Sequence, residues 1–202
     1  MAIIDGYCSL EDVKAALRIT DTVDDGLLEI SIEAASREIE GFCERVFTST
    51  SGVRVYRPVD SFLVETDDIV SLTTLKTDPG GDKSFSITFD TNDFQLEPLN
   101  GVAGGIASPS NIIRAVGKFL FPIFEPKNVN HNAASVQVTG VFGFATVPTA
   151  VRQAAILLSM RQFKRYDSPT GVMGFGDMVL RVGRIDPDVE KLLMPFRRMR
   201  TA

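Results

Sequence analysis

The chain has 202 residues, of which 44% are hydrophobic and 23% are charged, ordinary values for a globular protein with a sizeable core. No apolar run reaches the roughly 18 residues of a membrane span, and the first residues lack a basic stretch followed by an apolar one. We therefore expect no membrane partner and no signal peptide, and we expect the two cysteines, Cys8 and Cys43, to be free, buried thiols rather than a disulfide.

The net charge of −5 is spread unevenly along the chain. Residues 1–51 carry 11 acidic and 4 basic groups, residues 52–146 carry 10 and 7, and residues 147–202 carry 5 and 10. An acidic start and a basic end attract each other. The sequence therefore predicts that these two parts pack together within one fold, between neighbouring copies, or in both ways.

Two helices are predicted in the first 51 residues. Ser9 and Asp12 have the spacing of an imperfect capping box, which opens a helix to about Ile19. The second helix begins at Asp24-Asp25 and has one apolar stripe with spacings of four and three: Leu28, Ile32, Ala35, Ile39, Phe42 and Val46. Its opposite face is charged and consists of Glu33, Arg37, Glu40 and Glu44.

The middle of the chain has the pattern of short strands. Segments with alternating or β-branched residues are separated by turns rich in glycine, proline, asparagine and aspartate. They cover residues 53–57, 71–77, 85–90, 94–97, 113–121 and 135–142. This pattern predicts an antiparallel sheet or a small barrel.

Helical character returns at Pro148, a suitable first helical residue, and continues to about Tyr166. A last helix opens at Asp186-Pro187 and runs to about Arg198, after a candidate strand over residues 178–182. In the helix from Pro148, Val151, Ala154, Ala155, Leu158 and Gln162 follow helical spacing, and the apolar ones among them form a second stripe. Neither this stripe nor the one that begins at Leu28 can be buried by its own helix alone. We therefore predict an α+β fold: a helical bundle formed by residues 1–51 and 147–202, with an inserted antiparallel β-rich region over residues 52–146.

The sequence carries no recognisable catalytic or metal-binding motif. The single histidine, His131, lies in a polar loop, and no CxxC, HExxH or G-x-S-x-G motif occurs. The glycines at 101–105 and 171–176 lack the lysine and the strand–loop–helix context of a phosphate-binding loop. The pairs Asp24-Asp25 and Asp67-Asp68 leave a two-carboxylate hydrolase open, but nothing singles out either pair. We predict no cofactor, no metal and no enzymatic activity.

Basic residues gather at the end of the chain, where Arg197, Arg198 and Arg200 lie beside Phe196. Cations at the C-terminal end of a helix stabilise it by about 0.3–1 kcal/mol each, which accounts for one or two of them. DNA-binding domains are usually basic overall, whereas this chain is acidic, so specific DNA binding is disfavoured.

Two sets of short motifs occur in a characteristic order. The first set is Tyr7–Lys14, Asp24–Leu28, Glu33–Arg37 and Phe42–Phe47, and the second is Val147-Pro148, Arg165–Pro169, Gly174–Asp177 and Asp186–Val189. Together they resemble the head-to-tail connector (adaptor) proteins of tailed bacteriophages. The resemblance covers both helical ends, about half of the chain.

This resemblance implies a structural protein of the virion, made in the host cytoplasm. It implies a ring, typically of twelve copies, that sits below the portal and meets the next connector or a tail-completion protein. DNA would pass through the channel during genome ejection without specific binding.

The implied roles fall on three sets of residues. Portal docking would involve Phe196, Arg197, Arg198 and Arg200. Ring contacts would pair Glu33, Arg37, Glu40 and Glu44 with Arg161 and Arg165. A loop that contains Gly171, Gly174, Phe175 and Gly176 would become ordered on assembly. The alternatives are another virion component, such as a stopper or tail-completion protein, and a small hydrolase.

Overall fold

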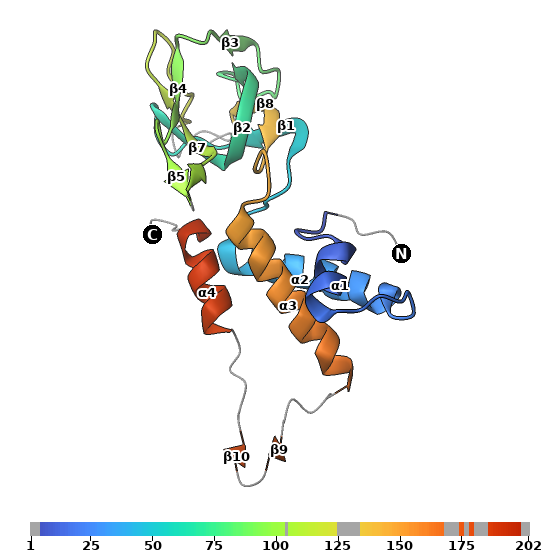
Figure 1. Ribbon diagram of the computed structural model, residues 1–202. Coiled ribbons are helices and arrows are strands. Elements are labelled where there is room, and N and C mark those ends of the chain that lie inside the picture. The colour runs from blue at the N-terminus through green and yellow to red at the C-terminus, as the bar shows by residue number, and fades with distance from the viewer. Residues whose placement is uncertain are drawn as a thin grey trace. The chain divides into compact units, whose positions relative to one another are not determined.

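The computed structural model describes residues 5–103, 105–124, 134–167, 174–175, 178–179 and 186–198. The chain forms two compact units: Met1–Phe47 with Val147–Ala202, and Thr48–Thr146. The first unit holds the helices and the second holds the sheet (Figure 1). The predicted α+β fold, in which helices from both ends pack together and an antiparallel sheet is inserted between them in sequence, is confirmed.

The helical unit begins with α1 (Leu10–Leu17) and α2 (Asp25–Cys43). The predicted capping box of α1 is complete, because the Asp12 N–H donates to Ser9 Oγ and the Ser9 N–H donates to Asp12 Oδ2. The helix α2 ends earlier than predicted, since Glu44 adopts a left-handed conformation with φ of 52°. Val46 therefore lies beyond the helix and is exposed.

The C-terminal part contributes α3 (Thr149–Asp167), α4 (Pro187–Leu193) and a 3₁₀ turn, η1 (Met194–Phe196). We predicted a single helix from Asp186 to about Arg198, but Pro195 has no N–H to continue an α-helix. The chain instead tightens into η1, and the Arg197 N–H donates to the Met194 carbonyl. Within the described residues, no helix is long and apolar enough to cross a membrane.

The core of the helical unit lies where α2, α3 and α4 meet. The predicted stripe of α2 is buried from Leu28 to Ile39. Small residues of α3, Ala154 and Ala155, are also fully buried and permit close approach of the helices. The buried hydrophobic side chains on these three helices are Leu28, Ile32, Ala35, Ile39, Cys43, Val151, Ala154, Ala155, Leu158, Val189 and Leu193.

The sheet of the second unit contains six antiparallel strands in the order β1-β8-β2-β7-β4, with β3 paired to β2. Their bounds are β1 (Thr50–Tyr56), β2 (Leu63–Thr77), β3 (Ile87–Phe89), β4 (Phe94–Glu97), β7 (Ser110–Ala115) and β8 (Val136–Phe142). Two-residue strands form two separate pairs: β5 (Val102–Ala103) with β6 (Ile106–Ala107), and β9 (Gly174–Phe175) with β10 (Met178–Val179).

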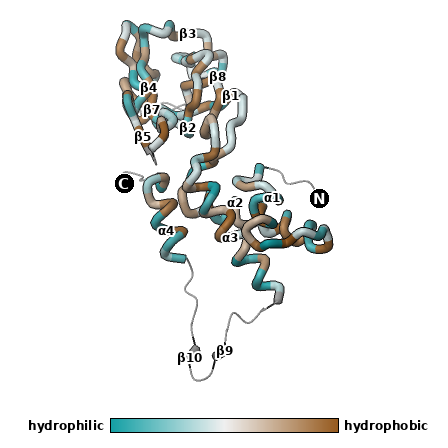
Figure 2. Tube along the Cα trace, in the orientation of Figure 1, coloured by the Kyte–Doolittle hydropathy of each residue, from teal (hydrophilic) through white to brown (hydrophobic). Residues whose placement is uncertain are grey.

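Hydrophobic and hydrophilic residues interleave along the strands (Figure 2), so one face of the sheet is buried. Along β8, Val136, Val138 and Phe142 point into the core. Gly140 lies between them, and a Cβ there would come within 2.3 Å of the Ser71 carbonyl oxygen. The strand β7 stops at Ala115, short of the predicted Phe121, because the N–H groups of the next two residues turn to the Asp93 carbonyl.

Candidate subunit-interaction surfaces

The segment after α4 is anchored in the helical unit. Phe196 is 0% exposed, and its ring meets the edge of the Phe47 ring at a centroid distance of 5.8 Å. Its side chain is therefore a core residue and does not lie on the surface where a docking residue is expected. The exposed Arg197 has its guanidinium 5.5 Å from the centre of the Phe42 ring.

The other predicted docking residues are placed as follows. Arg198 is half-buried, and its backbone N–H donates to the Cys43 carbonyl at 2.9 Å. Arg45 reaches back from the end of α2 to the Phe196 carbonyl. Arg200 lies outside the described residues. The hydrogen bonds and the Phe47 contact hold Arg197 and Arg198 in a defined place beside the end of α2, and their docking role stays a prediction.

A buried hydrogen-bond network around Tyr7 fixes the site at which Phe196 packs. The Tyr7 hydroxyl donates to Glu40 Oε1 and accepts the Phe47 N–H at 2.9 Å. The Tyr7 N–H donates to Ser36 Oγ. Burial, together with the Glu40 carboxylate, raises the pKa of Tyr7 well above its usual range, so the hydroxyl remains a neutral donor. No sequence motif pointed to this network, because its members are distant in the chain.

The predicted ring-contact residues of α2 differ in exposure. Glu40 faces Tyr7 and pairs with Arg37 at 3.0 Å, while Arg37 also donates to the Asp5 carbonyl. Glu33 is half-buried, whereas Arg37 and Glu44 are exposed. The charged face of α2 is therefore partly used inside the unit, and a role in ring contacts stays a prediction.

On α3, Arg161 is half-buried, and Arg165 is exposed near the end of the helix. The acidic start and the basic end of the chain do meet within one copy. Asp12 accepts two hydrogen bonds from the Arg152 guanidinium, at 2.6 and 3.0 Å, and Gln162 of α3 donates to Glu38 of α2. The Arg152 guanidinium lowers the pKa of Asp12 to about 2.

A second apolar face on α2 was missed by the sequence analysis. Leu27 and Ile30 are 40% and 45% exposed, and Ala34 and Gly41 continue the same side of the helix. The signal was present as spacings of three and four from Leu27 through Ile30 to Ala34, with Gly41 seven residues farther on. It was overlooked because the stripe through Leu28 already accounted for the helix.

The residues of the predicted assembly-ordered loop are only partly described. Gly174 and Phe175 form β9, which pairs with β10. Gly171 and Gly176 lie outside the described residues.

The polar groups that bear on catalysis have structural partners. Cys8 and Cys43 are free and buried as predicted, and burial raises the pKa of each thiol to about 11. Asp25 pairs with Lys14 at 2.6 Å. Asp67 accepts hydrogen bonds from Arg54 and from the Tyr56 hydroxyl. In the part of the chain that the structure describes, no three histidine, cysteine or carboxylate side chains gather as a metal site.

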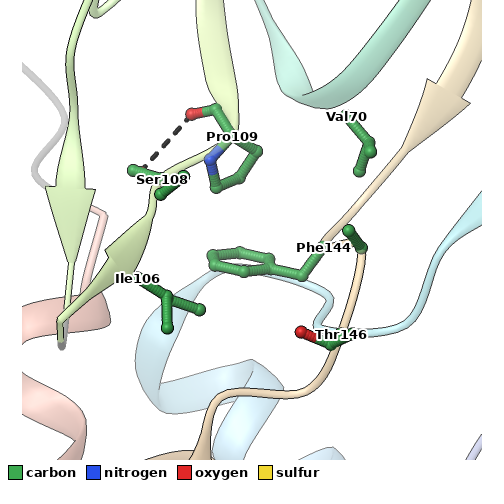
Figure 3. Close-up of a pocket in the computed structure, with 8 residues that line it drawn as sticks. Val70, Ile106, Ser108, Pro109, Phe144 and Thr146 are labelled. Carbon is green, nitrogen blue, oxygen red and sulfur yellow. Dashed lines mark hydrogen bonds between the residues drawn. The ribbon is translucent and has the colours of Figure 1, made fainter.

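The β unit contains an open pocket of about 350 Å³. Figure 3 shows the rings of Phe144 and Pro109 and the side chain of Ile106 around this space, with the Ser108 hydroxyl donating to the Pro109 carbonyl. None of its lining residues is charged: Val70, Ile106, Ala107, Ser108, Pro109, Phe144, Ala145 and Thr146. Such a lining suits an apolar side chain and supplies no acid, base or nucleophile pair.

Residues 7–97 match the family described as "Phage gp6-like head-tail connector protein". No curated protein matches the chain. Three solved structures share its fold over its whole length. They are "Neck of empty GTA particle computed with C6 symmetry" (16% identity, 95% of that chain, TM-score 0.59), "Neck of native GTA particle computed with C12 symmetry" (15%, 94%, 0.57) and "Virion of native gene transfer agent (GTA) particle" (19%, 95%, 0.54).

Proposed function

Because residues 7–97 match the phage gp6-like head-tail connector family, we propose that the chain is a connector of this kind, which forms a ring below the portal and joins the head of a virion to its tail. The family is structural, not enzymatic. The observation that carries the proposal is the family match over residues 7–97, which contain α1, α2 and the first strands of the sheet. The shared fold with neck proteins over the whole chain supports it.

We propose twelve copies in the ring. The support is the C12 symmetry with which one neck structure of this fold was computed. A ring also suits the charge distribution. The helix α2 contains five carboxylates and one arginine, while α3 contains four cations and one carboxylate. Unlike surfaces on opposite sides of one subunit produce a head-to-tail contact, which closes into a ring when the rotation permits.

The proposed portal contact is the segment that follows Phe196. Phe196 and the hydrogen bond from Arg198 to Cys43 hold this segment in place, and Arg197 and Arg198 supply positive charge, with Arg200 beyond the described residues. The opposite face of the ring would meet the next connector or a tail-completion protein. The segment containing Gly171, Gly174, Phe175 and Gly176 would take a single conformation against a partner.

DNA is proposed to pass through the ring during ejection without being held. Each phosphate that a protein neutralises adds salt-dependent affinity, and a chain with a net charge of −5 offers a poor surface for such contacts. A conduit requires this weak affinity, because bound DNA would have to be released at every step.

The docking proposal is tested with the double variant Arg197→Glu/Arg198→Glu, mixed with the portal protein of the same particle and analysed by sedimentation. We expect co-sedimentation to fall at least tenfold. The variant Lys83→Glu/Lys118→Glu changes the same number of charges at exposed positions of the β unit and should bind like the unaltered protein.

Arg198 has contacts within the unit, so circular dichroism must show that the double variant is folded, and Arg197→Glu alone provides a second test. Undiminished portal binding by both folded variants would eliminate this segment as the docking site.

A further inference from the structure

The helix α2 is apolar on two opposite faces. Leu28, Ile32 and Ile39 are 0% exposed and face α3 and α4. At 3.6 residues per turn, a second set of residues falls on the other side of the helix, where Leu27 and Ile30 are exposed. We name this second set the outer α2 stripe: Val23, Leu27, Ile30, Ala34 and Gly41.

Isolated hydrophobic side chains on a surface are ordinary, but Val23, Leu27 and Ile30 follow one another at helical spacing. Beyond Ala34, the exposed Arg37 and Glu38 separate Gly41 from this apolar part of the stripe. Val23, in the turn before the helix, is 86% exposed. Leu27 and Ile30 follow in the first two turns, and the small residues Ala34 and Gly41 leave room for another backbone to approach. Surface helices usually bury one apolar stripe. A second stripe indicates another packing partner.

The outer side of α3 has complementary properties. Leu157 is 37% exposed, and Gln153 and Lys164 lie at spacings of four and seven on the same side of the helix. We name these three residues the outer α3 stripe. Lys164 and Arg165 are exposed cations of this helix, while Arg152 is paired with Asp12 of the same copy. Four of the five charged residues of α3 are basic, whereas five of the six on α2 are acidic.

Within one copy the two stripes face away from each other. The helices α2 and α3 pack against each other (Figure 1). Since their buried residues, such as Ile32 and Ala155, lie on the opposite sides from the outer stripes, each outer stripe is turned from the shared core. The exposed side chains of Leu27, Ile30 and Leu157 can therefore meet one another only between copies. Because the two stripes differ, the contact is head-to-tail and repeats from one copy to the next.

We propose that the outer α2 stripe packs against the outer α3 stripe of the neighbouring copy, so that α2 and α3 alternate around the assembled ring. This inference rests on the proposed ring and specifies the surfaces that close it. Apolar contact between Ile30 and Leu157 lies at its centre, with carboxylates of α2 beside cations of α3.

The test is cysteine cross-linking in the double variant Ile30→Cys/Leu157→Cys, mixed with the portal protein of the same particle. A bis-maleimide reagent about 8 Å long tolerates a shift of one helical turn, about 5.4 Å. We expect a ladder of covalent multimers on a denaturing gel. Native Cys8 and Cys43 are buried, and the single variants Ile30→Cys and Leu157→Cys should therefore give at most dimers.

A matched control is Val53→Cys/Leu157→Cys, since Val53 is also exposed but lies on β1. It should give no ladder. A second measurement uses Leu27→Ser/Ile30→Ser, which should keep the thermal midpoint of the free protein and lower the mass of its portal complex at least twofold. The variant Val53→Ser/Val55→Ser should leave that mass unchanged.

Light scattering on the unaltered protein distinguishes a failure of the proposed interface from a failure of the proposed connector function. If it forms a ring on the portal while Ile30→Cys/Leu157→Cys gives no ladder, the stripes are not the interface and the connector function stands. If the unaltered protein does not join the portal, both the function and the interface are overturned.

Discussion

At the residue scale, Asp12 links the acidic start of the chain to its basic end. Its carboxylate closes the capping box of α1 and also accepts two hydrogen bonds from Arg152. These contacts lower its pKa from 3.8 to about 2, with Arg152 the largest cause. A lowered pKa in the folded chain adds stability that is complete above about pH 4 and is lost as the pH falls toward 2.

The variant Asp12→Asn isolates the charge, because an asparagine side chain still accepts the Ser9 N–H. Arg152 is more than half exposed, so the free energy of unfolding at pH 7 should fall by only about 0.5–1 kcal/mol. Urea unfolding should show this difference shrinking between pH 5 and pH 2.5. Glu11→Gln, on the same helix, serves as the control. A difference that is undiminished at pH 2.5 would mean that the ion pair is not its source.

The hydroxyl group of Tyr7 is expected to contribute to stability through its buried hydrogen-bond partners. In Tyr7→Phe, the aromatic contact with Phe47 remains, but the Phe47 N–H and the Glu40 carboxylate lose their hydroxyl partner. Unsatisfied buried groups cost about 1–3 kcal/mol, and denaturant unfolding should show a loss of that size. Tyr166→Phe, at an exposed position, should change stability by less than about 0.5 kcal/mol. Equal effects of the two variants would contradict the network.

At the scale of elements, features that depend on residues close together in the sequence were predicted correctly. Features that depend on contacts between residues far apart in the sequence were missed. The capping box of α1, the start of α2 and the strand β4 follow from adjacent residues, and they lie where the sequence indicated. The first half of β2 was missed because Glu65, Asp67 and Asp68 interrupt its apolar pattern. Asp67 is accommodated by Arg54 and Tyr56 from β1, a pairing that no local pattern reveals.

The candidate interaction surfaces also have some features that neighbouring residues predict and others that depend on distant contacts. The basic cluster after Phe196 is visible in the sequence, but the burial of Phe196 depends on Phe47, about 150 positions away. The outer α2 stripe was visible as a spacing, yet its exposure depends on which face α3 covers. A stripe on a helix has no inward or outward direction until a packing partner is known.

Among the glycines that the structure describes, Gly143 would have the closest contact with an added side chain. Its φ is +102°, and a Cβ would lie 1.9 Å from the Thr48 carbonyl oxygen. Gly143→Ala should therefore reduce the free energy of unfolding by more than about 1 kcal/mol. Gly52→Ala, where a Cβ would meet nothing within 4 Å, should be tolerated. Thermal unfolding of both variants compares them, and a harmless Gly143→Ala would show that the backbone there differs.

At the scale of the whole molecule, the β unit is an insertion between two helical segments that share one core. The predicted boundaries, 1–51, 52–146 and 147–202, stay a prediction, and we propose that residues 48–146 are an independently folding domain. That unit has its own core, which includes Phe89 stacked on Phe121 at 5.4 Å.

A fragment of residues 48–146 should give a dispersed ¹H–¹⁵N NMR spectrum. Its peaks should overlay those of the same residues in the full chain, because the six strands and their core lie within the fragment. A collapsed spectrum would mean that the sheet depends on the helical unit, and the domain proposal would be withdrawn.

The central claim is that this chain is a ring-forming connector, and the most direct measurement is its mass by light scattering, alone and mixed with the portal of the same particle. We predict a complex whose added mass corresponds to a full ring, close to twelve chains of 22.1 kDa. A protein that leaves the mass of the portal unchanged, whatever its own oligomeric state, would contradict the account.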